Sequence, residues 1–180
     1  MKEILIKGVE AFDESTNQFI TTKDTLIHIE HSLISISTWE AKWHKPFLSQ
    51  LPSHKKTDEE MLDYIRCMCL DKNVDQMIFN MISAENLQEI KDYIDDPMTA
   101  TTFNDIMNNR PPSREIITSE IIYYWMVANQ IPFECQKWHL NRLLTLIQVC
   151  SIKSQPPKKM GRGDYARKQH ALNKSRLRGH

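Results

Sequence analysis

The stretch Leu26-Ile27-His28-Ile29-Glu30-His31-Ser32-Leu33-Ile34-Ser35-Ile36-Ser37-Thr38-Trp39-Glu40 contains the change of hydrophobic period that decides the fold. Up to Leu33 the side chains alternate between two faces and β-branched residues are frequent, which is typical of a strand. From Ser37 the order Ser-Thr-Trp-Glu fits a capping box, in which Ser37 caps a backbone amide and Glu40 reaches back. The stretch therefore predicts that strands give way to helices at Ser37.

The residues before this stretch also indicate β structure. Ile4, Ile6 and the pair Phe19-Ile20 flank a polar segment, Asp13-Glu14-Ser15-Thr16-Asn17, which has the composition of a turn. We predict a two- or three-stranded antiparallel sheet within residues 1–36. Such a small sheet needs an apolar surface to lie on, and the helices that follow it supply one.

Residues 37–152 are predicted to form a helical body that makes one domain with the sheet. Trp39 and Trp43 share a helix face before Pro46, and Thr57-Asp58-Glu59-Glu60 fits a second capping box. Two shorter helices are expected over 74–82 and 84–94, and a loop over 98–113. The second of these helices begins after Ser83 and stops at Asp95-Asp96-Pro97.

The most strongly helical part lies towards the C-terminus. Thr118-Ser119-Glu120 opens one helix, and a longer helix is predicted from Phe133 to Ile152. Two helices joined by so short a linker usually pack against each other. The expected fold class is therefore α+β, mostly α, with a small N-terminal antiparallel sheet, a helical body and a flexible basic C-terminal tail.

Charge divides the chain into two parts. Nine of the 23 basic residues but one of the 23 acidic residues lie between Lys153 and His180, which leaves 14 basic and 22 acidic residues before Lys153. An acidic body thus carries a basic tail, residues 153–180, whose few apolar residues are typical of a flexible segment. This asymmetry predicts a tail that binds an acidic partner, including other copies of the body, or that folds back on its own body.

Composition excludes several function classes. Only four glycines are present, and no Gly-rich phosphate loop or hydrolase elbow occurs. The N-terminus has no apolar stretch typical of export, so the four cysteines indicate reduced thiols in the cytosol. The richest apolar run, Ile121 to Ala128, is too short to cross a bilayer, so we expect no membrane partner.

Residues with side chains suited to catalysis or metal binding do not form a convincing site. His28, Glu30 and His31 offer only two ligands on one strand face, whereas zinc needs three or four. The sulfurs of Cys67 and Cys69 would diverge on a helix, and packing explains Cys135 with His139 better than catalysis does. A solvated helix end explains Asp92, Asp95 and Asp96 better than a cation site does. We predict no catalytic residue, no metal and no cofactor, and hence a protein that is not an enzyme.

Partner binding is the better hypothesis, and two groups of residues support it. The aromatic residues are either core or an exposed anchor patch, because Tyr and Trp dominate interface hot spots. The cations of the tail contact either nucleic acid or an acidic protein surface, and a protein is favoured because the body offers no basic face. The candidate partner-binding residues are Tyr123, Tyr124, Trp125, Phe133, Trp138, Lys158, Lys159, Arg162, Arg167 and Lys168.

Three segments, His31 to Leu48, Asp95 to Phe103 and Ser113 to Leu144, resemble a family of small proteins encoded in the structural gene clusters of tailed bacteriophages. The resemblance covers most of the chain, including the basic end after Pro156-Pro157. Such proteins are associated with tail assembly chaperones, which are made near the tape measure protein.

The resemblance implies a non-enzymatic tail assembly chaperone that binds the tape measure protein, and also tail tube subunits, in the host cell cytoplasm. It would keep a long helical partner soluble until the tail tube polymerises around it, with self-association as a further expectation. The alternatives are a minor tail or baseplate protein of the virion, and a nucleic-acid-binding protein that uses the basic tail.

Overall fold

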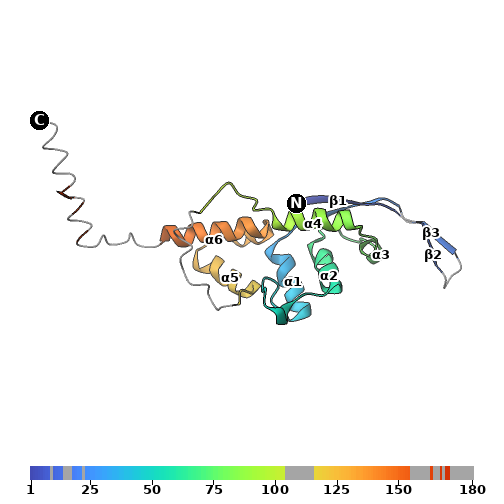
Figure 1. Ribbon diagram of the computed structural model, residues 1–180, viewed down its shortest axis with the longest axis horizontal. Helices are drawn as coiled ribbons and strands as arrows, with labels where there is room; N and C mark the ends of the chain where they lie inside the picture. The colour runs from blue at the N-terminus through green and yellow to red at the C-terminus, as the bar shows by residue number, and fades with distance from the viewer. Residues whose placement is uncertain are drawn as a thin grey trace, which may run out of the picture. The chain divides into compact units, whose positions relative to one another are not determined.

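The structure is a computed structural model that describes residues 1–8, 10–13, 18–21, 23–103 and 116–154 together with Gly163, Arg167, Gln169 and His170 (Figure 1). The chain divides into two compact units, Met1–Cys150 and Ser151–His180. A small antiparallel N-terminal sheet precedes a mainly helical body, so the predicted α+β, mostly α class is confirmed. None of the described helices is both long and apolar enough to cross a membrane.

The N-terminal strands form two antiparallel ladders. Strand β1 (Lys2–Ile6) pairs with β4 (Thr25–Ile29), and β2 (Glu10–Asp13) pairs with β3 (Gln18–Thr21). Ile6 lies opposite Thr25 and Glu10 lies opposite Thr21, so both ladders share one register. Residues 14–17, most of the predicted turn, lie outside the described residues.

The first helix begins earlier than predicted. Helix α1 (Leu33–Trp43) is capped by Ser32, whose side chain accepts a hydrogen bond from the Ser35 amide at 3.3 Å. The predicted boundary between 36 and 37 and the predicted capping box at Ser37 are therefore wrong. Leu33 and Ile36 are fully buried on one helix face, and burial of these two side chains favours the earlier start.

Glu40 joins two distant parts of the body instead of capping a helix. Its buried carboxylate accepts hydrogen bonds from the amides of Phe47 and Ser119, both at 2.7 Å. Ser119 is the first residue of α5 (Ser119–Ala128), so the negative charge lies at the positive end of that helix. This contact fixes α5 against α1 and the loop that follows α1.

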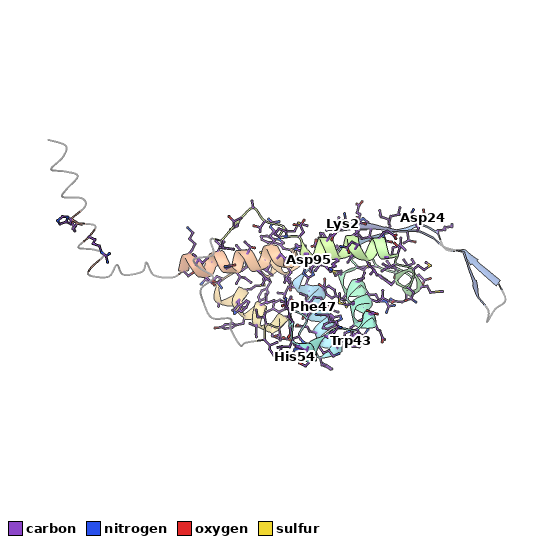
Figure 2. The ribbon with its side chains drawn as sticks, in the orientation of Figure 1. Lys2, Asp24, Trp43, Phe47, His54 and Asp95 are labelled. Atoms are coloured by element: carbon purple, nitrogen blue, oxygen red, sulfur yellow. The ribbon has the colours of Figure 1, made fainter. Side chains whose placement is uncertain are left out.

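Helix α2 (Asp58–Met68) packs on α1 through paired polar and aromatic groups. The predicted capping box of Thr57 and Glu60 is confirmed. The indole of Trp43 donates to Asp63 at 2.9 Å, and the indole of Trp39 donates to the backbone oxygen of Glu60 at 2.7 Å. Figure 2 labels Trp43 in this region. Lys42 forms an ion pair with Asp63, and Lys45 forms one with Glu60. Both buried carboxylates of α2 are therefore paired with a lysine.

The remaining elements follow in the predicted order with changed bounds. Helix α3 (Gln76–Phe79) is shorter than expected, whereas α4 (Ala84–Asp95) begins after Ser83 as predicted and ends at Asp95, one residue beyond the predicted 94. A short 3-10 segment, η1 (Pro52–His54), lies between α1 and α2. Residues 104–113, most of the predicted loop, lie outside the described residues.

The predicted helix from Phe133 to Ile152 is wrong because it is interrupted. A 3-10 segment, η3 (Phe133–Lys137), is followed by extended backbone and then by α6 (Leu140–Ser154). His139 forms an isolated bridge with Ser32, and the Leu140 amide donates to the His31 oxygen at 2.7 Å. Pairing with the distant β4–α1 connection therefore replaces the helical hydrogen bonds that a continuous helix would make.

The two segments that pair here each contribute one buried histidine, His31 and His139. The rings of His31 and His139 are 5.1 Å apart, and His31 Nδ1 shares a hydrogen bond of 2.5 Å with the Tyr64 hydroxyl. His139 Nε2 donates to the Tyr93 backbone oxygen at 2.9 Å. Burial, together with the nearby His139, lowers the pKa of His31 to about 3, so the core contains a neutral imidazole at neutral pH.

Removal of the Glu40 carboxylate should destabilise the fold strongly. Glu40→Ala leaves the buried amides of Phe47 and Ser119 without an acceptor, so we expect a loss of about 3 kcal/mol or more. Glu40→Gln keeps one oxygen acceptor and should lose roughly half as much. Urea unfolding measures both, with the exposed Glu59→Ala as a control expected to cost below about 1 kcal/mol. Equal, small losses for all three variants would contradict this role of Glu40.

Acid should destabilise the protein through His31. The unfolded chain binds a proton at His31 near pH 6.5 and the folded protein only near pH 3, so the unfolding free energy falls as the pH is lowered through that window. The loss that His31 causes reaches about 3 kcal/mol at pH 4.

His31→Asn removes the titrating group and retains a side-chain oxygen that can accept from Tyr64. We expect this variant to lose less unfolding free energy than the wild type between pH 7 and pH 4. The comparison is needed because the pKa values of Glu60 and Asp63 are lowered in the folded protein, so protonation of these two carboxylates in acid also destabilises the fold. Equal losses for variant and wild type would exclude His31 as a contributor.

Candidate functional site: the exposed surface of α5

Helix α5 is apolar around most of its circumference, and only part of it faces the core. Ile122 and Met126 are fully buried, at positions four residues apart on one helix face. On another side Tyr124 is 69% exposed and Val127, three residues later, is 59% exposed. These two side chains are neighbours on the helix surface, so an apolar strip of α5 is left in contact with solvent.

The segment after α5 extends this strip. The Ile131 amide donates to the Met126 oxygen at 2.8 Å and the Ile131 side chain is buried, which holds the chain beside the helix. Phe133 follows with 54% of its surface exposed, and its ring centroid lies 6.4 Å from that of Tyr123. We refer to Tyr123, Tyr124, Val127 and Phe133 together as the α5 surface.

Tyr123 connects the α5 surface to the interior. Its side chain is partly buried, and its hydroxyl donates to Gln136 Oε1 at 2.9 Å. Burial raises the pKa of this phenol, so it remains protonated at neutral pH. The hydrogen bond fixes the ring beside Phe133 and therefore gives the surface one aromatic side chain of fixed orientation.

The structure separates the five aromatic residues predicted to bind a partner. Tyr124 and Phe133 are exposed, and Tyr123 lies between surface and core. Trp125 and Trp138 are partly buried and pack against the core, and the guanidinium of Arg142 lies 4.3 Å from a Trp138 ring centroid. The two interpretations, core and exposed patch, thus apply to different members of the set.

Acidic side chains lie next to the α5 surface. Glu120 and Glu134 are exposed at the start of α5 and in η3, and Lys137 is an exposed cation nearby in sequence. A hydrogen bond from the Thr118 side chain and backbone hydrogen bonding lower the pKa of Glu120, so its carboxylate is charged at neutral pH. An apolar strip with acidic neighbours is suited to binding an apolar side chain beside a basic one.

The predicted cationic residues belong to the second unit. Lys158, Lys159, Arg162 and Lys168 lie outside the described residues, as does most of the predicted flexible tail. Arg167 is described, lies in helical backbone and is exposed.

The candidate metal ligands His28, Glu30 and His31, in β4 and directly after it, contact separate partners. His28 Nδ1 lies 3.0 Å from Asp71, whereas Glu30 accepts a hydrogen bond from the Tyr93 hydroxyl at 2.7 Å. His31 faces Tyr64 in the core. Across the described ranges, no three His, Cys, Asp or Glu side chains gather closely enough to hold a metal ion.

Cys135 and His139, the candidate nucleophile and base, do not form a catalytic pair. His139 uses one ring nitrogen for Tyr93 and accepts from the Asn141 amide with the other, at 3.3 Å, so neither nitrogen is available to Cys135. Burial raises the pKa of the Cys67 thiol to about 11 and also raises that of Cys69. Neither of these two thiols is activated as a thiolate.

Sequence reasoning missed Val127 and Gln136, although both belong to this site. The spacing of three residues from Tyr124 to Val127 was a usable signal, because it places both on one helix face. Gln136 had no such signal, since its contact with Tyr123 depends on how η3 folds back.

Comparison with known proteins gives no relative: no protein-family model, curated protein or solved structure matches this chain significantly. Function is therefore inferred from the α5 surface and from the resemblance described above.

Proposed function

We propose that this protein is a non-enzymatic binding protein that holds a protein partner on the α5 surface. The observation that carries the proposal is the exposure of Tyr124 and Val127 on one helix surface, with the exposed Phe133 next to Tyr123 of the same helix. Isolated exposed apolar residues are ordinary, but adjacent aromatic residues are typical of interface hot spots. Burial of these side chains by a partner would recover free energy that the folded chain alone does not gain.

The partner best suited to this surface is an amphipathic helix. A helix presents apolar side chains at three- and four-residue spacing, which matches the strip formed by Tyr124 and Val127. Glu120 and Glu134 favour basic residues at the edges of that helix. Following the resemblance to phage proteins, we propose a tail assembly chaperone whose partner is the tape measure protein, with tail tube subunits as further partners, acting in the host cell cytoplasm.

Loss of the two most exposed rings should weaken partner capture without unfolding the protein. We expect Tyr124→Ser with Phe133→Ser to reduce binding of the co-expressed tape measure protein at least about tenfold, as loss of a hot spot does. The melting temperature should change little because both side chains are exposed. Leu87→Ser, a similarly exposed residue on α4, is the matched control and should bind as the wild type does. Unchanged capture by the double variant would reject the α5 surface as the binding site.

The alternative role, a minor tail or baseplate protein, uses the same kind of surface in a permanent contact. Mass spectrometry of purified particles distinguishes the two roles. A chaperone leaves before the tail is complete, so we expect the chain to be absent from mature particles or present only in traces. Many copies per particle would favour the structural role.

Nucleic-acid binding is the third proposal, and its support is the basic segment from Lys153 to His180. If the segment neutralises phosphates, deletion of 158–180 should flatten the dependence of DNA affinity on salt concentration. For the favoured protein partner, we expect weak DNA binding whose salt dependence hardly changes on deletion. A steep slope that the deletion removes would favour nucleic acid instead.

A further inference from the structure

The strand pair β1–β4 has one buried face and one open face. Ile4, Ile6, Ile27 and Ile29 are buried on the inner face. On the outer face Leu5 and Leu26 are cross-strand partners, and each is 48% exposed. Cross-strand apolar partners are ordinary in a sheet whose two faces are covered, but here the described structure leaves about half of each of these two side chains in contact with solvent. Figure 2 labels Lys2 and Asp24, which lie at the two ends of this strand pair.

A third leucine joins the outer face through the segment beside β4. The Leu70 amide donates to the His28 oxygen at 2.8 Å, and Cys69 forms a bridge with Ile29. Leu70 therefore lies beside His28 in register, and 53% of its surface is exposed. The outer face thus contains three exposed leucines, Leu5, Leu26 and Leu70.

Backbone hydrogen bonding directs a partner to the face and not to the edges of the strands. The edge of β4 is occupied, because the His28 oxygen accepts from Leu70 and the Glu30 amide donates to the Met68 oxygen. On β1, the Leu5 oxygen accepts a hydrogen bond from the Asn86 side chain of α4 at 3.2 Å. Addition of another strand would compete with these contacts, whereas packing on the leucines would not.

The charges beside Leu5 identify the partner. Glu3 and Lys7 are both exposed and lie two residues before and two residues after Leu5, so each is about 7 Å from it along the strand. Two copies can face each other across a two-fold axis that lies between them, perpendicular to β1 and level with Leu5. This axis places Glu3 of one copy opposite Lys7 of the other. The same axis sets His28 near Asp24 of the other copy, because these residues flank Leu26 in the same way.

We propose that the outer face of β1–β4 binds the same face of a second copy of this chain. The two strands β1 lie antiparallel across the axis, with Leu5 on Leu5 at the centre and Glu3–Lys7 pairs at both sides. An isologous contact of this kind needs a self-complementary surface, and the equal spacing of opposite charges about Leu5 provides it. The proposal is independent of the partner assigned to the α5 surface.

The size of the face sets the strength of the contact. A strand pair of this length with one adjacent segment measures about 17 Å by 15 Å, which is smaller than a standard protein interface. We therefore expect a reversible dimer with a dissociation constant in the range of about 10 to 100 μM.

Charge reversal tests the proposed pairing by sedimentation equilibrium up to about 0.5 mM, well above that range. The wild type should dimerise. Glu3→Lys alone places two lysine side chains opposite each other at both sides of the axis, and Lys7→Glu alone places two glutamates opposite each other there. Each single variant should therefore dimerise at least about tenfold more weakly, because two favourable ion pairs become two repulsive ones.

The mixture of the two single variants is the decisive measurement. In a Glu3→Lys chain facing a Lys7→Glu chain, both contacts across the axis join opposite charges, so a heterodimer should form with near wild-type affinity. Lys7 also interacts with Glu85 in its own chain, and mixing leaves this internal contact unchanged in each variant. Circular dichroism verifies that both variants are folded.

Tyr124→Ser is the control for the other surface and should dimerise as the wild type does. The proposal would be overturned by a monomeric wild type over the whole concentration range, by single variants that dimerise normally, or by a mixture that stays monomeric. Loss of the dimer in Tyr124→Ser would also overturn it, because self-association would then involve α5.

Discussion

The segment from His28 to Ser32, which leads from β4 into α1, contacts three parts of the chain that are distant in sequence. Its backbone pairs with the end of α2 through Met68 and Leu70, and with the start of α6 through Leu140. Its side chains extend these contacts, because Glu30 accepts from Tyr93 of α4 and His31 faces Tyr64 of α2. The sheet and three of the helices therefore share one set of polar contacts, and the apolar core is built around it.

This arrangement buries polar side chains, and each of them destabilises the fold unless it is hydrogen-bonded or ion-paired. A buried imidazole is tolerated when it is neutral and hydrogen-bonded, which is the state of His31 beside Tyr64. The buried acids follow the same rule, since Glu40 accepts hydrogen bonds from two backbone amides and Glu60 forms an ion pair with Lys45. Such paired groups specify one arrangement of the helices more narrowly than apolar packing does, because each accepts few alternative partners.

The two exposed apolar areas follow from the same packing. Helix α5 uses Ile122 and Met126 for the core and is fixed at its start by Glu40, so Tyr124 and Val127 must face outwards. The β1–β4 pair uses its isoleucines for the core, so Leu5 and Leu26 must face away from it. Both apolar areas lie on elements whose opposite faces are already buried in the core. The core does not need these exposed side chains, and we therefore assign them to partner binding.

Local signals in the sequence were enough to locate several helix ends. Thr57 with Glu60 and Ser83 before α4 lie where they were predicted, and α4 ends at the first residue of the predicted stop, Asp95-Asp96-Pro97. Each of these signals depends on contacts within a single turn. The overall class, a small sheet followed by helices, also follows from the change of hydrophobic period.

Tertiary contacts decided the rest. Ser32 and Ser37 are both suitable caps, and only the burial of Leu33 and Ile36 selects Ser32. The sequence around His139 favours a continuous helix, yet pairing with Ser32 breaks it. Trp125 and Tyr124 are adjacent and similar in character, and the packing of α5 alone makes one partly buried and the other exposed. Sequence by itself thus determined the fold class and the helix ends set by local caps, because caps and periodicity act over a few residues. Which faces are buried, and so which remain free for partners, depends on contacts between segments far apart in the chain.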